Sequence, residues 1–198
     1  MLDIIIPIFA AFSHILFVTN FIFINRESIK RLAINIAIPI FIAGHLIIIA
    51  NLTRHSITLL TQPKSLSFDK TTRDYGILGH ALLAISIIMQ VSIFRNMDFN
   101  IYRVLFVIGQ MGMMLLYYLS YQQSHAKINN INNINNINNI NNINNITIDI
   151  KSLYLIIPAL IIFYIREAII ASTSWQKIVA IIMTIVYIDW LIYISTLI

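Results

Sequence analysis

The sequence has no cysteine, only five glycines and four prolines, and charged residues make up just 11% of its 198 positions. Without cysteine, disulfides, thiolate metal sites and a cysteine nucleophile are excluded. A typical soluble domain is about 25% charged. The low charge therefore argues against a soluble enzyme, a disordered chain and a nucleic-acid-binding module. So few glycines also disfavour a carrier built from broken, glycine-rich helices.

What the sequence contains instead is long apolar stretches. Hydrophobic residues make up 59% of the chain, and the mean hydropathy is +0.82. A helix that crosses a bilayer needs about 20 mostly apolar residues. The stretches that meet this requirement are residues 4–24, 32–49, 76–94, 104–121, 153–170 and 178–197. The sequence thus predicts an all-α integral membrane bundle with about six transmembrane helices.

An Ile-Asn-Asn repeat separates the fourth and fifth of these stretches. It runs from residue 128 to 146, and its period of three matches neither a strand nor a helix. Asparagine also favours turns, so we expect a surface loop; a stacked asparagine ladder formed on self-association is the alternative. The predicted organisation is a four-span bundle over 1–124, a low-complexity loop over 125–150 and a helical hairpin over 151–198.

Basic residues lie most densely in the tight turns that follow the first, third and fifth stretches. The positive-inside rule places those turns on the inner side and both ends of the chain on the outer side. The first stretch carries Asp3 and has no basic segment before it, so we expect it to remain as an anchor. We expect a multi-pass protein of the bacterial cytoplasmic (inner) membrane or of an organelle inner membrane. Its expected partner is the lipid bilayer, other membrane subunits are further candidates, and nucleic acid is not expected.

Two histidines form the most specific candidate site. His45 and His80 lie on consecutive antiparallel stretches, each about 8–10 Å below the same surface at 1.5 Å per helical residue. Neutral imidazole is a common ligand of haem iron and of other metals. If a cofactor is bound, we expect both histidines to ligate haem b, with room for the macrocycle beside Gly76 and Ala84. His14 is expected to lie too deep to reach the same iron. Ordinary hydrogen bonding between helices is the favoured alternative.

A carboxylate inside the last stretch is a second candidate. Charged residues within spans are costly and indicate function by default. One interpretation places Tyr187, Trp190 and Tyr193 in an interfacial aromatic belt, with Asp189 reaching to the surface. The other makes Asp189 a buried carboxylate that handles protons or cations, with His14 at a comparable depth.

A polar stripe in the fourth stretch is the third candidate. Its members are spaced to fall along one side of a helix: Gln110, Met114, Tyr118, Tyr121 and His125. Such a stripe can line a polar cavity, and it ends at the interfacial His125.

No motif indicates an enzyme. The sequence lacks a glycine-rich phosphate loop, a zinc-protease signature and a nucleophile elbow. Three functions stay open. The favoured one is an accessory or assembly subunit without catalysis. The alternatives are a haem b or other membrane redox protein that uses His45 and His80, and a small proton-coupled transporter that uses Asp189 and His14.

Overall fold

The computed structural model describes residues 2–24, 36–61, 69–93, 99–132, 153–154 and 156–197. The described part is helical and contains no strand, which confirms the predicted all-α fold. Its helices are α1 (Leu2–Ile24), α3 (Ala37–Thr61), α4 (Lys70–Ser92), α5 (Ile101–Asn132), α7 (Pro158–Ile170) and α8 (Ser174–Leu197).

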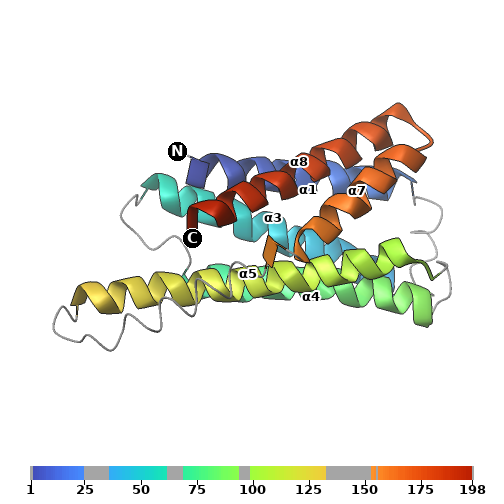
Figure 1. Cartoon of the computed structure of the whole chain (residues 1–198). Helices are drawn as coiled ribbons and strands as arrows, with labels where there is room; N and C mark the ends of the chain where they lie inside the picture. The colour runs from blue at the N-terminus through green and yellow to red at the C-terminus, as the bar shows by residue number, and fades with distance from the viewer. Residues whose placement is uncertain are drawn as a thin grey trace.

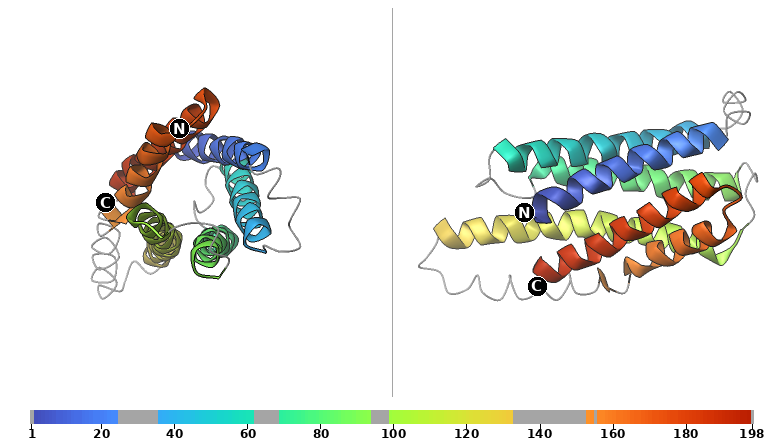
Figure 2. Two further views of the ribbon diagram at one scale, coloured as in Figure 1. Left: turned by 90° about the vertical axis from the view of Figure 1, so that its right-hand side faces the viewer. Right: turned by 90° about the horizontal axis from the view of Figure 1, so that it is seen from above.

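The helices form a closed ring. Each packs against the helices before and after it in the chain, and α8 packs against α1. Figure 2 shows this ring from one end in its left-hand view. The beginning of α1 and the end of α8 lie at the same end of the ring (Figure 1), which we call the terminal end. The opposite end, which holds the turn between α7 and α8, is called the turn end. The hairpin of α7 and α8 thus completes the ring that the first four helices leave open.

Five of the helices are long and apolar enough to cross a membrane, namely all except α7. The protein is therefore a multi-pass helical membrane protein, and its orientation and its particular membrane stay predictions. The helix expected over 153–170 is shorter than predicted. α7 has 13 residues with Pro158 at its start, a length of about 20 Å. Proline lacks an N–H and is favoured in the first turn of a helix, so it fixes where α7 begins.

The second span differs most from its prediction. It was expected to end at residue 49, where polar residues begin, but α3 continues to Thr61. The side-chain amide of Asn51 donates to the carbonyl oxygen of Thr72 in α4 at 3.0 Å. The Ser56 hydroxyl donates to the Leu52 carbonyl at 2.8 Å. Because the protein itself satisfies these polar groups, the helix can continue through them.

The fourth span also runs past its predicted end. α5 ends at Asn132, so the first five residues of the repeat, 128–132, continue a helix rather than forming a loop. The rest of the repeat, from residue 133 onward, lies outside the described residues. The division of the chain into three parts stays a prediction.

The contact between α3 and α4 is close because glycines face each other. A Cβ atom added at Gly44 would lie 2.9 Å from the carbonyl oxygen of Gly79. One added at Gly79 would lie 2.5 Å from Cγ1 of Ile48. Small residues allow helices to approach in this way in membranes. Three contacts fix the register of the pair: Ala37 with Ser86, Gly44 with Gly79, and Asn51 with Thr72.

Candidate functional site

Every helix of the ring contributes a buried polar side chain near the middle of the bundle. None of the six is more than 3% exposed: His14 of α1, His45 of α3, His80 of α4, Gln110 of α5, Tyr164 of α7 and Tyr187 of α8. We call this set the polar centre. Contacts described below join His14 with His45, His80 with Gln110, and Tyr187 with both Gln110 and Tyr164. Buried polar groups in lipid are costly unless they are paired, so such a concentration needs a physical explanation.

His14 and His45 form a hydrogen bond between their Nδ1 atoms at 2.8 Å. Two imidazole nitrogens can bond in this way only when one carries a hydrogen and the other does not. The pair therefore holds one proton between the two rings, and it keeps that bond whether the pair is neutral or carries a single positive charge. His14 was expected to lie too deep to share an iron with His45, but its ring touches that of His45. Because α3 extends to Thr61, His45 lies near the middle of its helix and meets His14 there.

His80 pairs with a different helix. Its Nδ1 donates to Oε1 of Gln110 at 2.6 Å. In a neutral ring this bond leaves Nε2 of His80 without a hydrogen. The register of α3 and α4 places His45 and His80 about two residues, or about 3 Å, apart in depth. The two therefore lie at similar levels, but deeper than the expected depth of about 8–10 Å, because α3 continues to Thr61. His80 is within electrostatic range of His14 and His45.

Four buried polar atoms of the centre have no hydrogen-bond partner in the described part of the chain. They come from four different helices: Nε2 of His45, Nε2 of Gln110 and the hydroxyls of Tyr164 and Tyr187. The Tyr187 hydroxyl lies within interaction distance of both Gln110 and Tyr164, but these contacts fall short of normal hydrogen-bond geometry. The two tyrosine rings stack with centroids 5.5 Å apart. An unsatisfied buried polar group typically costs about 1–3 kcal/mol. Several in one place indicate a site that binds a polar ligand, water or a proton.

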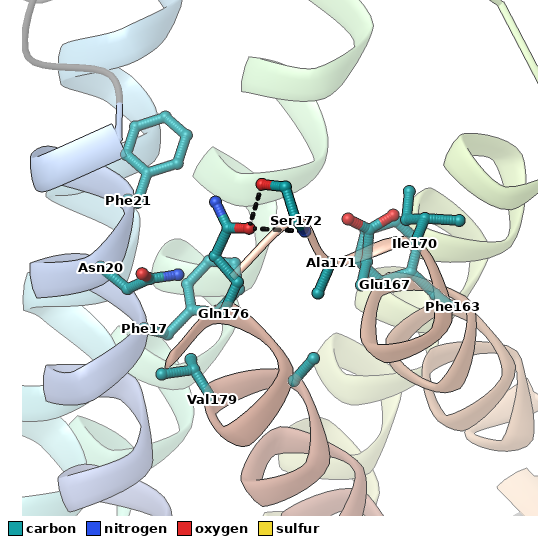
Figure 3. A pocket seen from close by; sticks show the side chains of 11 residues that line it. Phe17, Asn20, Phe21, Phe163, Glu167, Ile170, Ala171, Ser172, Gln176 and Val179 are labelled. Carbon is teal, nitrogen blue, oxygen red and sulfur yellow. Dashed lines mark hydrogen bonds between the residues drawn. The ribbon is translucent and has the colours of Figure 1, made fainter. Parts of the chain in front are cut away.

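A cavity at the turn end leads toward this centre. It has a volume of about 280 Å³ and lies between α1, α7 and α8 (Figure 3). Its polar lining includes Asn20, Glu167 and Gln176; Arg166 donates to Glu167 at 2.6 Å. We call this cavity the vestibule.

One aromatic side chain lies between the vestibule and the polar centre. Phe17 lines the vestibule, and its ring centroid is 5.0 Å from that of His45 and 5.7 Å from that of Tyr164. Phe17 therefore stands between the vestibule and the buried side chains of the polar centre.

The arrangement does not fit a haem held by His45 and His80. The space expected beside Gly76 is filled, because a Cβ atom there would lie 2.4 Å from the ring of Tyr117. That ring is 5.7 Å from His80, and the ring of Phe41 is 4.7 Å from His45. Among the described residues, no group of three or more acidic or histidine side chains could hold a metal ion. Haem ligation by these histidines stays a prediction, and no chemistry is derived from it.

The interfacial belt expected in α8 is wrong for the two aromatic residues that can be checked. Tyr187 and Trp190 are 1% and 3% exposed and face the interior; the side chain of Tyr193 lies outside the described part. Asp189 is partly buried on the same helix. Its suggested companion, His14, bonds to another histidine instead. A role for Asp189 therefore stays a prediction.

The polar stripe expected along α5 is not one buried face. Gln110 is fully buried, whereas Tyr118 is 45% exposed. His125 is partly buried, and its Nδ1 bonds to the Tyr121 carbonyl of its own helix at 3.1 Å. It lies about 22 Å along the helix from Gln110, outside the polar centre.

Sequence reasoning missed Tyr164 altogether, and it missed the central position of Tyr187. Both stand in apolar runs, where nothing local distinguishes a central tyrosine from a packing one.

Comparisons with known proteins find no matching family model, no similar curated protein and no similar solved structure. The fold and the apolar helices define the class: a multi-pass helical membrane protein whose helices surround a buried polar centre.

Proposed function

We propose that the protein is a small proton-coupled transporter. In this proposal the His14–His45 pair carries the proton, and the remaining polar centre binds a small hydrogen-bonding solute. The observation that carries the proposal is a set of four buried polar atoms that make no hydrogen bond of normal geometry in the described part of the chain, three of them clustered on Gln110, Tyr164 and Tyr187. A purely structural bundle would be expected to pair or omit such groups.

The histidine pair is chemically suited to relay a proton. A proton that binds Nε2 of one ring allows that ring to pass its Nδ1 proton to Nδ1 of the other ring, which then releases its own proton from Nε2. Atoms and charge balance, because one proton enters and one leaves. The pair bond of 2.8 Å provides the path, and the surrounding rings of Phe17 and Phe41 keep bulk water away.

The chemistry of the other members indicates the class of solute. The free amide N–H of Gln110 donates, and the hydroxyls of Tyr164 and Tyr187 donate or accept. The six members include no carboxylate and no guanidinium. Such a site suits a small, uncharged molecule with several hydrogen-bonding groups. In this proposal the solute enters from the vestibule at the turn end, and Phe17 must move to let it reach the polar centre.

The test is proton flux into liposomes that contain the full chain and an enclosed pH-sensitive dye. A potassium gradient with valinomycin drives the flux, with and without a panel of small uncharged polar solutes. We expect flux above that of protein-free liposomes. His14→Ala and His45→Ala should each lower it by about 100-fold, the scale of a lost proton-transfer group. His125→Ala is the matched control, because this histidine lies outside the centre. Equal flux from all three variants would refute the proposal.

The two other functions predicted from the sequence, an accessory subunit and a haem protein, make different demands on the histidines. An accessory or assembly subunit should keep full function when His45 is replaced. A haem protein should show a visible absorption band that His45→Ala and His80→Ala each remove. An optical spectrum of the purified protein separates these outcomes from the transporter.

A further inference from the structure

A second feature lies on the outer surface of the ring, away from the polar centre. Between α4 and α5, at the turn end, is a groove with a volume of about 300 Å³. Apolar side chains line it, including Ile88, Val91, Phe99 and Val107. Ile88 is 49% exposed and so faces outward. We call this depression the α4–α5 groove; it is large and apolar enough to hold part of a hydrocarbon chain.

One charged residue, Arg103, is among the described residues that line this groove, and one of its guanidinium nitrogens has no hydrogen-bond partner in the described part of the chain. That nitrogen, Nη1, is buried. The three other described arginines are all paired with carboxylates: Arg54 with Asp69, Arg73 with Asp74, and Arg166 with Glu167. A guanidinium that is partly removed from water without an anion is unfavourable. Nη1 of Arg103 is therefore available to an acceptor that the described chain does not supply, and an anion is the acceptor that suits a guanidinium best.

The position of Arg103 matches the level of lipid headgroups. Arg103 is the third residue of α5. Oδ1 of Asn100 caps the helix by accepting a hydrogen bond from the backbone N–H of Arg103 at 3.1 Å. The cap fixes the first turn and so holds the guanidinium at the mouth of the groove. In the predicted orientation this end faces the cytoplasm, whose leaflet carries the anionic lipids.

We propose that the α4–α5 groove binds an anionic phospholipid. One acyl chain lies in the apolar groove, and the phosphate oxygens accept hydrogen bonds from Arg103. A guanidinium presents a fork of N–H donors that fits phosphate oxygens two at a time. A free phosphate ion would leave the apolar wall unused. A zwitterionic lipid such as phosphatidylcholine also carries a phosphate, but its own choline cation competes with Arg103 for that phosphate. The anionic lipid satisfies both parts of the groove without such a competitor.

The test is native mass spectrometry of the full chain in detergent, with equal amounts of phosphatidylglycerol and phosphatidylcholine. We expect the unaltered protein to retain phosphatidylglycerol preferentially. Arg103→Gln should reduce this preference by about tenfold, as for the loss of one charge-assisted hydrogen bond. Arg103→Lys should keep part of it. Lys177→Gln is the matched control, since it removes an exposed cation at the same end of the ring.

A second variant tests the groove itself. Val107→Trp fills the groove and leaves Arg103 in place, so it should reduce retention of phosphatidylglycerol even if Arg103→Gln fails to fold. Three results would overturn the proposal. They are equal retention of both lipids by the unaltered protein, an unchanged preference in Arg103→Gln, or full displacement of the lipid by inorganic phosphate. The measurement does not depend on transport, so it stands or falls separately from the proposed function.

Discussion

Two polar clusters in this bundle are built in opposite ways. At the terminal end, Arg54 donates to both carboxylate oxygens of Asp69, at 3.2 and 2.5 Å. Asp69 also accepts from the backbone N–H of Thr72 at 2.7 Å and so caps α4. We call this cluster the α3–α4 clasp. In the polar centre, by contrast, four buried polar atoms make no hydrogen bond of normal geometry within the described part of the chain.

The difference separates two uses of polarity within a membrane protein. Groups whose partners all come from the chain fix how helices meet, and their value is structural. Polar groups that are held in place but left without a hydrogen bond are available to a polar ligand, a water molecule or a proton that enters the site. Hence stability should respond to changes in the α3–α4 contact and clasp, whereas transport should respond to changes in the polar centre.

The largest effect on stability should come from the helix contact beside the clasp. Gly79→Val places side-chain atoms against Ile48 and against the backbone of Gly44, so α3 and α4 must separate. We expect the free energy of unfolding to fall by about 1–3 kcal/mol, measured by denaturation in detergent micelles. Leu46→Val, which alters a lipid-facing side chain of α3 that is 54% exposed, should change little. If Gly79→Val unfolded like the unaltered protein, the close contact would not contribute to stability.

A smaller loss should follow from breaking the clasp itself. Asp69→Ala removes a helix cap, and we expect a cost of about 1–2 kcal/mol at neutral pH. Asp69→Asn keeps the cap but removes the charge pair, and so should cost less. Thermal unfolding of the two variants at pH 7 measures the difference. A cost in Asp69→Asn equal to that in Asp69→Ala would show that the ion pair, not the cap, matters.

The clasp also predicts a pH dependence. The hydrogen bond from Arg54 holds the pKa of the Asp69 carboxyl well below its usual range. A carboxyl with a lowered folded-state pKa stabilises the protein above its unfolded value of about 3.9 and loses that contribution as the pH falls further. The stability difference between the unaltered protein and Asp69→Asn should therefore be full at pH 6 and shrink in strong acid. A constant difference over that range would contradict this cause.

The smallest effect on stability is expected at the polar centre. Tyr187→Phe removes a buried hydroxyl whose contacts with Gln110 and Tyr164 fall short of normal hydrogen-bond geometry. Removing an unsatisfied group is neutral or slightly stabilising, so the melting temperature should stay the same or rise while proton flux falls. A large drop in melting temperature would place Tyr187 with the clasp, as a structural group, and would remove the contrast between the two clusters.

The sequence alone determined the class of the protein and the positions of its helices. Length and hydropathy are local properties, and in lipid each backbone polar group must bond within its own helix. For that reason the apolar runs were recognisable despite their many β-branched residues. The same reasoning identified His14, His45, His80 and Gln110 as polar groups within spans.

Only the tertiary structure decided which of these groups meet and where two of the helices end. Sequence reasoning ended the second span before Asn51, yet Asn51 is satisfied by Thr72 on the next helix, and α3 continues. That extension moves His45 inward to His14. Closure of the ring by α7 and α8 brings Tyr164 and Tyr187 to the same centre. These outcomes depend on contacts between helices distant in sequence, and no local pattern encodes such contacts.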